Sequence, residues 1–153
     1  MVYTAQPPVQ PPEERALLID FWGQGLGDPV HAGQEAIIDE LAPAPQDIVQ
    51  TKWRYSAFYR SDLKKIMQEQ GRNQLIISGI YTHIGCMTTA LDAFMNDIQP
   101  FLVSDATADF SAQEHAMAIK YVSQRCGVSV SSNRLQHWLA GEESLDQTGA
   151  AQQ

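Results

Sequence analysis

The sequence predicts an α/β fold of the doubly wound, Rossmann-like kind, a three-layer sandwich with a mostly parallel sheet between helices. Short apolar runs alternate along the chain with helical segments, as right-handed crossovers between parallel strands require. One run, residues 75–81, is apolar without alternation. Such a run is typical of a parallel strand covered on both faces.

The first half of the chain is expected to hold two strands and one helix. Residues 2–4 resemble the end of a strand, and the four prolines within residues 6–12 require an extended loop after it. Residues 47–51 indicate a second strand. Ser61 is the expected N-cap of a helix over residues 61–67.

The second half has a more regular alternation of strands and helices. Residues 86–98 repeat apolar side chains every three or four positions, which predicts a helix. Ser111 and Glu114 form a capping box that opens a helix ending at Gly127. The expected strands here are residues 74–81, 101–105 and 128–131, the last followed by a short helix. Because a doubly wound sheet builds outward from a central first strand and this chain opens at a strand end, we expect the sheet to lack that strand.

Composition limits the partners that the protein can bind. We expect one domain over residues 1–140 and a polar, flexible tail over residues 141–153. Ten Lys and Arg against eighteen Asp and Glu give a net charge of −8, which argues against nucleic acid and acidic membranes as partners. The two cysteines and the lack of a secretory signal predict a cytoplasmic protein.

The segment 79–94 is the most informative part of the chain. It predicts a buried strand that runs through a glycine turn into the start of a helix. The N–H groups of Gly85, Cys86 and Met87 are expected to point unpaired into a crevice, where they favour an anion. The four histidines show no paired ligand spacing, so neither a metal nor another cofactor is expected. For His83, which lies in the turn, a structural hydrogen bond and a catalytic role both stay open.

Six segments, in this order, resemble the isochorismatases, particularly those of catecholate siderophore pathways. Together they extend from the start of the chain to about residue 130. The resemblance implies a hydrolase that cleaves isochorismate into pyruvate and 2,3-dihydro-2,3-dihydroxybenzoate by general acid catalysis, without a covalent intermediate. The segments are YTAQP (3–7), LIDFWG (18–23), TKWRYSAF (51–58), GIYTHIGCMTTALDAF (79–94), DIQPF (97–101) and ADFS (108–111).

The resemblance also implies two catalytic positions. Lys52 matches the active-site lysine, a positive charge for the substrate carboxylate or for charge developing at the ether oxygen; a solvent-facing lysine is the alternative. Gly85 stands where the wider superfamily has a cysteine nucleophile. Cys86 follows by one residue, which rotates its side chain by about 100° and away from the substrate.

Six further residues are implied to bind substrate. Gln6 and Arg15 match loop residues, and Arg15 is suited to a bidentate hold on a carboxylate. Tyr81 matches a residue preceded by a non-proline cis peptide. Surface or core roles are the alternatives for all of these residues. The aromatic residues Phe21, Trp53 and Tyr55, with Trp22 and Phe58, are expected to form an apolar wall around the substrate ring.

The chain departs from the family at the general acid. The family places this aspartate in a segment reading roughly LLxHDMQ, upstream of TAQP, and the printed sequence holds no such segment there. Asp20, within LLIDF, matches the later DFWG stretch and is not that acid. The domain is therefore expected to be incomplete at its N-terminus, poorly stable or prone to aggregate.

Several alternatives stay open at this point. The chain is either an isochorismatase or a catalytically dead, truncated remnant that acts as a scaffold or binding surface. Two enzymatic alternatives are the aminodeoxyisochorismate hydrolase of phenazine pathways and a cysteine hydrolase that uses Cys86. Protein partners implied by the resemblance are a second copy of the chain, an aryl carrier protein and a siderophore synthetase.

Overall fold

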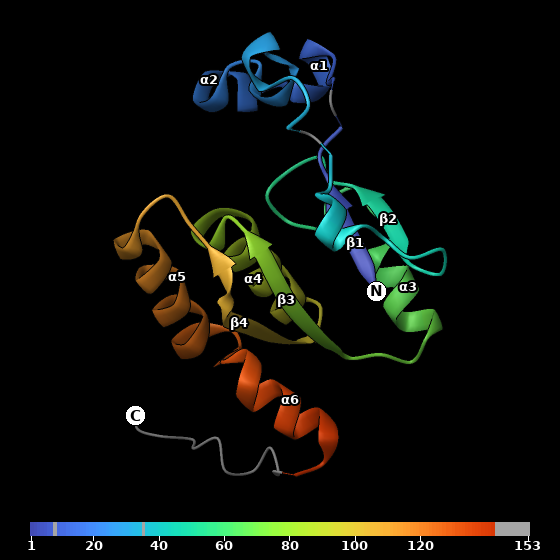
Figure 1. Ribbon diagram of the computed structural model, residues 1–153, viewed down its shortest axis with the longest axis vertical. Coiled ribbons are helices and arrows are strands. Elements are labelled where there is room, and N and C mark those ends of the chain that lie inside the picture. Colours follow the sequence, from blue (N-terminus) through green and yellow to red (C-terminus); the bar gives the residue numbers. More distant parts are fainter. Residues whose placement is uncertain (8, 35, 143–153) are drawn as a thin grey trace. The chain divides into compact units, whose positions relative to one another are not determined.

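The computed structural model describes residues 1–7, 9–34 and 36–142. The chain divides into two compact units, Met1–Gln70 and Gly71–Gln153. Each unit is described by itself (Figure 1). Parallel strands and helices alternate in both, so the α/β class is confirmed.

The first unit is built on two parallel strands. β1 (Val2–Ala5) pairs with β2 (Ile48–Thr51), and the register places Val2 opposite Ile48. α3 (Leu63–Glu69) follows and buries Leu63 and Met67. The segment between the strands forms α1 (Pro12–Arg15), α2 (Leu18–Trp22) and three 3-10 turns at Gly25–Gly27, Pro29–His31 and Asp39–Leu41. The sequence pattern gave no sign of α1 and α2, because helices of four and five residues are too short to show a helical period.

The second unit is a three-stranded parallel sheet with helical crossovers. Its strands lie in the order β3 (Gln74–Ile80), β4 (Gln99–Ala108), β5 (Val128–Val130). A π-helical turn, η4 (Thr82–Cys86), and α4 (Met87–Met95) connect β3 to β4. α5 (Ala112–Arg125) connects β4 to β5, and α6 (Ser132–Ala140) follows. Strands and helices were thus predicted here to within a few residues.

Helices cover both faces of this sheet, as the sequence predicts. One cluster packs the strand residues Ile77 and Leu102 against α4 and α5, and includes Cys86, Ala90, Val122 and Cys126. A second cluster lies on the opposite face, where α6 packs against the strands; its members are Phe101, Val103 and Val130, with Val128, Leu135 and Trp138 around them.

β3 differs from its prediction, because only one of its faces is covered. Ile76 and Ile80 keep 47% and 65% of their surface exposed, whereas Ile77 keeps 7%. The physical reason is that the α6 cluster is built on β4 and β5 and does not extend over β3. Among the described residues, β1 and β3 each pair with one neighbouring strand.

Two glycines stand where the backbone geometry favours a residue without a side chain. Gly79 has a φ of +117° where the β3–β4 register shifts, immediately before the turn. A Cβ on Gly127 would lie 2.7 Å from Pro100 Cγ and 2.8 Å from the Pro100 carbonyl oxygen. The start of β5 therefore packs directly on β4.

The ends of the helices follow the expected chemistry in part. The Ser111 hydroxyl accepts the Glu114 N–H at 3.2 Å and donates to its carboxylate at 2.9 Å, which confirms the capping box. α3 begins two residues later than predicted, with the Leu63 N–H donating to Ser61 Oγ at 3.3 Å. α6 ends at Gly141, whose φ is +76°. Most of the predicted tail, residues 143–153, lies outside the described residues. No helix in the described part of the chain is both long and apolar enough to cross a membrane.

Candidate active site

The turn after β3 carries two of the predicted site residues, Tyr81 and Gly85. The Ile80–Tyr81 peptide bond is cis, as the resemblance implies. Residues 82–86 then wind as a π-helix before α4 begins at Met87. Sequence periodicity starts at the α-helix, so it could not show the wider turn in front of it.

The amide groups of this turn are paired, contrary to the expectation from the sequence. The N–H groups of Ile84, Gly85 and Cys86 all donate to the Tyr81 carbonyl oxygen, at 3.3, 2.9 and 3.2 Å. The Met87 N–H donates to carbonyl oxygens within the turn as well. The prediction of unpaired donors at Gly85, Cys86 and Met87 is therefore wrong. The reason is the π-helical winding, which brings one carbonyl under three successive amides.

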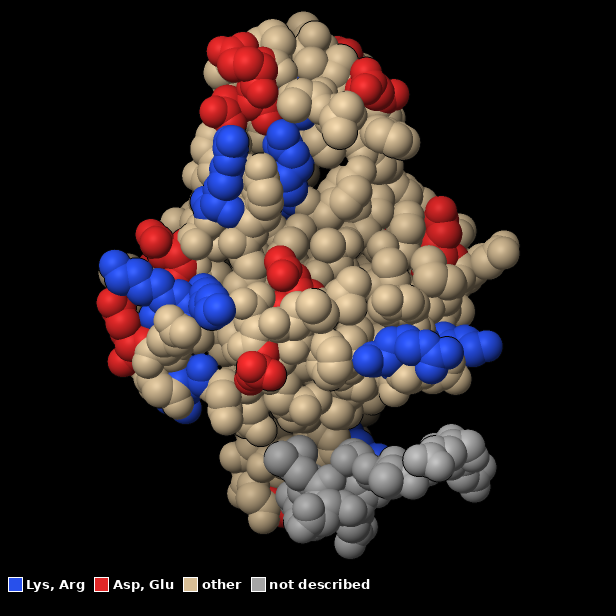
Figure 2. Space-filling view, turned by 180° about the vertical axis from the view of Figure 1, so that it is seen from behind, with Lys and Arg blue, Asp and Glu red and all other residues tan. Residues whose placement is uncertain are grey.

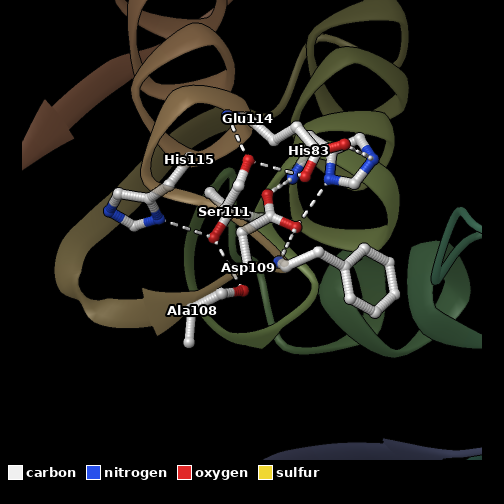
Figure 3. Close-up of polar contacts among 8 residues, drawn as sticks. His83, Ala108, Asp109, Ser111, Glu114 and His115 are labelled. Atoms are coloured by element: carbon white, nitrogen blue, oxygen red, sulfur yellow. Dashed lines mark hydrogen bonds and ion pairs between the residues drawn. The ribbon is translucent and has the colours of Figure 1, made fainter.

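An anion does lie at the start of this turn, and it belongs to the protein. Asp109 Oδ2 accepts the His83 backbone N–H at 2.7 Å, and Asp109 Oδ1 accepts the His83 ring Nδ1–H at 2.6 Å (Figure 3). The Phe110 N–H donates to Asp109 Oδ1 at 2.9 Å. The Asp109 side chain is 0% exposed. Burial raises its pKa, but the hydrogen bonds from His83 and Phe110 outweigh burial and hold the pKa of Asp109 below its usual value.

The neighbouring residues of the turn are held by the same loop after β4. The Thr82 hydroxyl donates to the Ala108 carbonyl oxygen at 3.0 Å and lies 2.9 Å from His115 Nδ1. Because the single hydroxyl proton goes to the carbonyl, His115 Nδ1 must carry the proton of the second bond. The rings of Tyr81 and Phe110 stack with centroids 4.0 Å apart.

The same cluster is a candidate for a cation, although the sequence spacing predicts no metal. Ligand atoms of His83, Asp109 and Glu114 lie within 4.8 Å of one another. His83 Nε2 lies 3.8 Å from a Glu114 carboxylate oxygen. Both Asp109 oxygens accept N–H groups of His83, so a cation bound by Asp109 would have to compete with those bonds.

Cys86 is turned into the core, as the one-residue offset from Gly85 predicts. It is 5% exposed and packs with Ile77, Ala90 and Leu102 in the cluster under α4 and α5. A thiol in that position does not face the turn's solvent side. The geometry therefore disfavours Cys86 as a nucleophile.

In the first unit, Lys52 lies among aromatic residues. Its ammonium group donates to the Tyr55 carbonyl oxygen at 2.5 Å. The Tyr55 hydroxyl in turn accepts the Trp22 indole N–H at 2.8 Å. The structure thus brings Lys52, Tyr55 and Trp22 together. Trp53 is half-buried beside them in the chain, whereas Phe21 is 76% exposed.

Arg15 is buried and bonded to its own loop. Its guanidinium donates to the carbonyl oxygens of Gly23 at 2.5 Å and Trp22 at 3.4 Å, and to the Gln10 side chain at 3.4 Å. Burial and the nearby Arg54 charge lower the pKa of Arg15. Gln6 is exposed just after β1.

The predicted site residues are therefore divided between the two units. Tyr81 and Gly85 belong to the second, and the other six belong to the first: Gln6, Arg15, Phe21, Lys52, Trp53 and Tyr55. Sequence reasoning did not single out Asp109, Thr82 and Phe110 for the turn. The ADFS segment was the available sequence signal, but it does not indicate that its aspartate, Asp109, bonds to His83.

Charge on the surface agrees with a partner that is not a polyanion. The face drawn in Figure 2 shows Lys and Arg groups beside Asp and Glu groups. With a net charge of −8, such a distribution offers little attraction to a phosphate backbone.

Named proteins from several bacteria are similar in sequence to most of this chain. Isochorismatase of Bacillus subtilis (strain 168) is 55% identical over 135 residues, which are 88% of this chain and 43% of that protein. Enterobactin synthase component B of Escherichia coli (strain K12) is 56% identical over 133 residues, 87% of this chain and 46% of that protein. Phenazine biosynthesis protein PhzD1 of Pseudomonas aeruginosa is 47% identical over 135 residues, 88% of this chain and 64% of that protein. The chain spans less than half the length of the first two relatives.

Solved structures and a domain family agree with these matches. A cysteine hydrolase from Pseudomonas syringae pv. phaseolicola 1448A superposes with a TM-score of 0.83 at 18% identity, over 93% of this chain and 72% of that one. At that identity the likeness shows the fold alone. The isochorismatase domain family matches residues 2–134. Because this match takes in most of the sequence and all eight predicted site residues, the chain belongs to the isochorismatase family.

Proposed function

We propose that this chain carries part of the active site of a hydrolase that cleaves the vinyl ether of isochorismate, for catecholate siderophore biosynthesis. The products are pyruvate and 2,3-dihydro-2,3-dihydroxybenzoate. The observation that carries the proposal is the 55% identity to a protein named isochorismatase and the 56% identity to enterobactin synthase component B.

The reaction sets the requirements for the site. A carboxylic acid protonates the terminal methylene carbon of the enolpyruvyl group, which becomes a methyl group and leaves an oxocarbenium ion at the ether carbon. Water adds to that carbon and loses a proton. The resulting hemiketal collapses, so that the carbonyl of pyruvate forms and the ring keeps the ether oxygen as a hydroxyl. No covalent bond to the protein is required.

Lys52 and Gly85 have the catalytic roles in this proposal. Lys52 supplies a fixed positive charge for the pyruvyl carboxylate or the ether oxygen. Its bond to the Tyr55 carbonyl supports this role, because that bond holds the ammonium group in one place. Gly85 leaves room for substrate where a side chain would otherwise project.

The remaining six residues are proposed to bind the substrate. Trp53, Tyr55 and Phe21 form its apolar surroundings, and Tyr81 lies in the turn beside Gly85. Gln6 offers a side-chain amide on the loop after β1. Arg15 requires an exchange of partners, because its guanidinium must leave the Gly23 and Trp22 carbonyls before it can bind a carboxylate.

The proposal assigns the general acid to none of the 153 residues. The printed sequence holds no LLxHDMQ segment before residue 4, where the family resemblance puts the acid. The competing proposal is a catalytically dead remnant that acts only as a scaffold or binding surface. It differs in predicting that no form of the protein cleaves isochorismate.

A pyruvate assay coupled to lactate dehydrogenase tests both proposals. We expect the full product of the gene to release pyruvate from isochorismate, and the isolated 153-residue chain to release none. Pyruvate release by the isolated chain at the rate of the full product would show that the acid lies within it. If neither form releases pyruvate, the hydrolase proposal is wrong and the remnant is favoured.

The phenazine branch remains a second candidate, because PhzD1 is 47% identical to this chain. The same assay with 2-amino-2-deoxyisochorismate separates the two. The siderophore proposal predicts a higher kcat/KM for isochorismate. A preference of tenfold or more for the amino substrate would move the protein to the phenazine branch.

We also propose a cytoplasmic location and partners of the siderophore pathway. Cys86 and Cys126 are both buried and are not joined in a disulfide, which agrees with a reducing compartment. The proposed partners are a second copy of the chain and an aryl carrier protein of a siderophore synthetase. Sedimentation velocity with and without the carrier protein measures both associations.

A further inference from the structure

Three consecutive residues, Tyr81, Thr82 and His83, are held by the last residue of β4, Ala108, and the two residues that follow it. The Tyr81 ring stacks on Phe110, the Thr82 hydroxyl donates to the Ala108 carbonyl, and His83 donates twice to Asp109. Each attachment uses a different kind of contact: ring stacking, a neutral hydrogen bond and two hydrogen bonds to a carboxylate. The loop after β4 therefore fixes both the position and the rotation of the turn.

Asp109 makes the strongest of these attachments. Its carboxylate is wholly buried and accepts three N–H groups, two from His83 and one from Phe110. Hydrogen bonds to an ionised acceptor are about twice as strong as neutral ones. Because a carboxylate only accepts, His83 Nδ1 must carry a proton, and Nε2 is the ring atom that faces Glu114.

The charge of Asp109 also complements the turn. N–H groups at the start of a helix leave partial positive charge there, which an anion stabilises. The deeper amides are already bonded to the Tyr81 carbonyl, so the His83 N–H is where the protein supplies its own anion. Loss of the carboxylate would leave the partly buried donors of His83, and the Phe110 N–H, without this acceptor.

We propose that Asp109 is a positioning residue, which acts through His83 to fix the turn that presents Tyr81 and Gly85 to the substrate. The inference rests on the proposed hydrolase function, since the turn matters for catalysis only if substrate binds there. Its physical basis is that a misplacement of about 1 Å at a reacting centre costs about 100-fold in rate. Asp109 itself needs no contact with substrate.

The test compares Asp109→Asn with Asp105→Asn in the full product of the gene. Asp105 is a matched control, because it lies four residues earlier, within β4, and accepts the N–H and hydroxyl of Ser132, each at 2.7 Å, at the start of α6. Hydrogen–deuterium exchange measures how fast the amide protons of the turn exchange, and it does not require an active protein. We expect Asp109→Asn to speed exchange at residues 83–86 by about tenfold or more, and Asp105→Asn to speed it only near Ser132.

Steady-state kinetics then measure how each substitution changes kcat. We expect Asp109→Asn to lower kcat at least tenfold at 25 °C, where the variant is still folded, while Asp105→Asn keeps the parent value. Unchanged exchange at residues 83–86 would overturn the attachment. Faster exchange with unchanged kcat and KM would overturn the positioning role. If the parent protein releases no pyruvate, the proposed function fails, and the exchange result still decides the attachment.

A second pair of variants covers the case in which Asp109→Asn does not fold. His83→Ala removes the ring donor, and His83→Asn keeps a side-chain amide donor for the Asp109 carboxylate. We expect the loss of kcat in His83→Ala to be largely restored in His83→Asn. Equal kcat in these two variants would contradict the proposal.

Discussion

At the scale of single residues, the site depends on charges held by main-chain groups. The Lys52 ammonium is bound by a carbonyl oxygen, and the Asp109 carboxylate is bound by N–H groups. Each charge is thereby held at least in part by main-chain groups, which the fold fixes. Such fixed charges are what electrostatic stabilisation of a transition state requires.

Replacement of Lys52 tests its catalytic role. In the full product of the gene, we expect Lys52→Ala to lower kcat by about 100-fold to 1,000-fold, because the developing charge loses its fixed partner. The thermal midpoint should change little. Lys65→Ala is the matched control, since Lys65 is exposed on α3 and forms an ion pair with Glu69 on the same helix, at 4.0 Å. Parent kinetics in Lys52→Ala would remove this residue from the mechanism.

Acid should weaken the fold partly through Asp109. The pKa of Asp109 is lowered in the folded protein, below an unfolded value of about 3.9. Its contribution to stability is therefore complete above about pH 4 and is lost as the pH falls through the folded pKa. Urea midpoints measured from pH 6 to pH 3 should fall less steeply for Asp109→Asn than for the parent protein. Identical slopes would show that Asp109 adds nothing to the acid dependence, which also includes Asp47 and Asp105.

At the scale of elements, the sequence predicted what depends on local pattern. Apolar periodicity located α4, and the capping residues with Gly127 located α5 and its start at Ser111. The paired amides at Gly85 could not be predicted, because the π-helical turn depends on how the chain leaves the bulge at Gly79. The pairing of His83 with Asp109 could not be predicted either, since the two residues are 26 positions apart and no local pattern indicates their contact.

The contact between β4 and the start of β5 gives a prediction about packing. We expect Gly127→Ala to destabilise the protein by about 1–3 kcal/mol, because its Cβ would overlap the Pro100 ring and carbonyl oxygen. Gly71→Asn is the control, since no atom lies within 4 Å of a Cβ there and asparagine tolerates a φ of +60°. Urea unfolding measures both. Equal stability of Gly127→Ala and the parent would mean that the two strands separate at little cost.

At the scale of the whole molecule, the open edge of β3 is the main departure from a closed sheet. β3 pairs with β4 alone among the described residues, and Ile76 and Ile80 remain exposed on it. Unpaired strand edges with apolar side chains favour association. The sequence predicted a strand covered on both faces. An apolar run shows that a strand can be buried on both faces, but it does not show whether other elements of the chain cover it.

Association of the isolated chain tests this interpretation. We expect the 153-residue chain to form larger species as its concentration rises, and the double variant Ile76→Lys/Ile80→Lys to do so less. Leu17→Lys is the control, because Leu17 is 74% exposed but lies outside the strands. Light scattering across a concentration series measures the size. An equal effect of Leu17→Lys would show that apolar surface in general, and not the β3 edge, drives association.

Proton NMR of the reaction in D2O tests the central proposal most directly. The full product of the gene is mixed with isochorismate, and the pyruvate methyl signal is followed from the first turnovers. We predict pyruvate with one deuterium in its methyl group and 2,3-dihydro-2,3-dihydroxybenzoate in equal amount, because the acid delivers its proton to the methylene carbon before water adds. Unchanged isochorismate, or early pyruvate without that deuterium, would contradict the account.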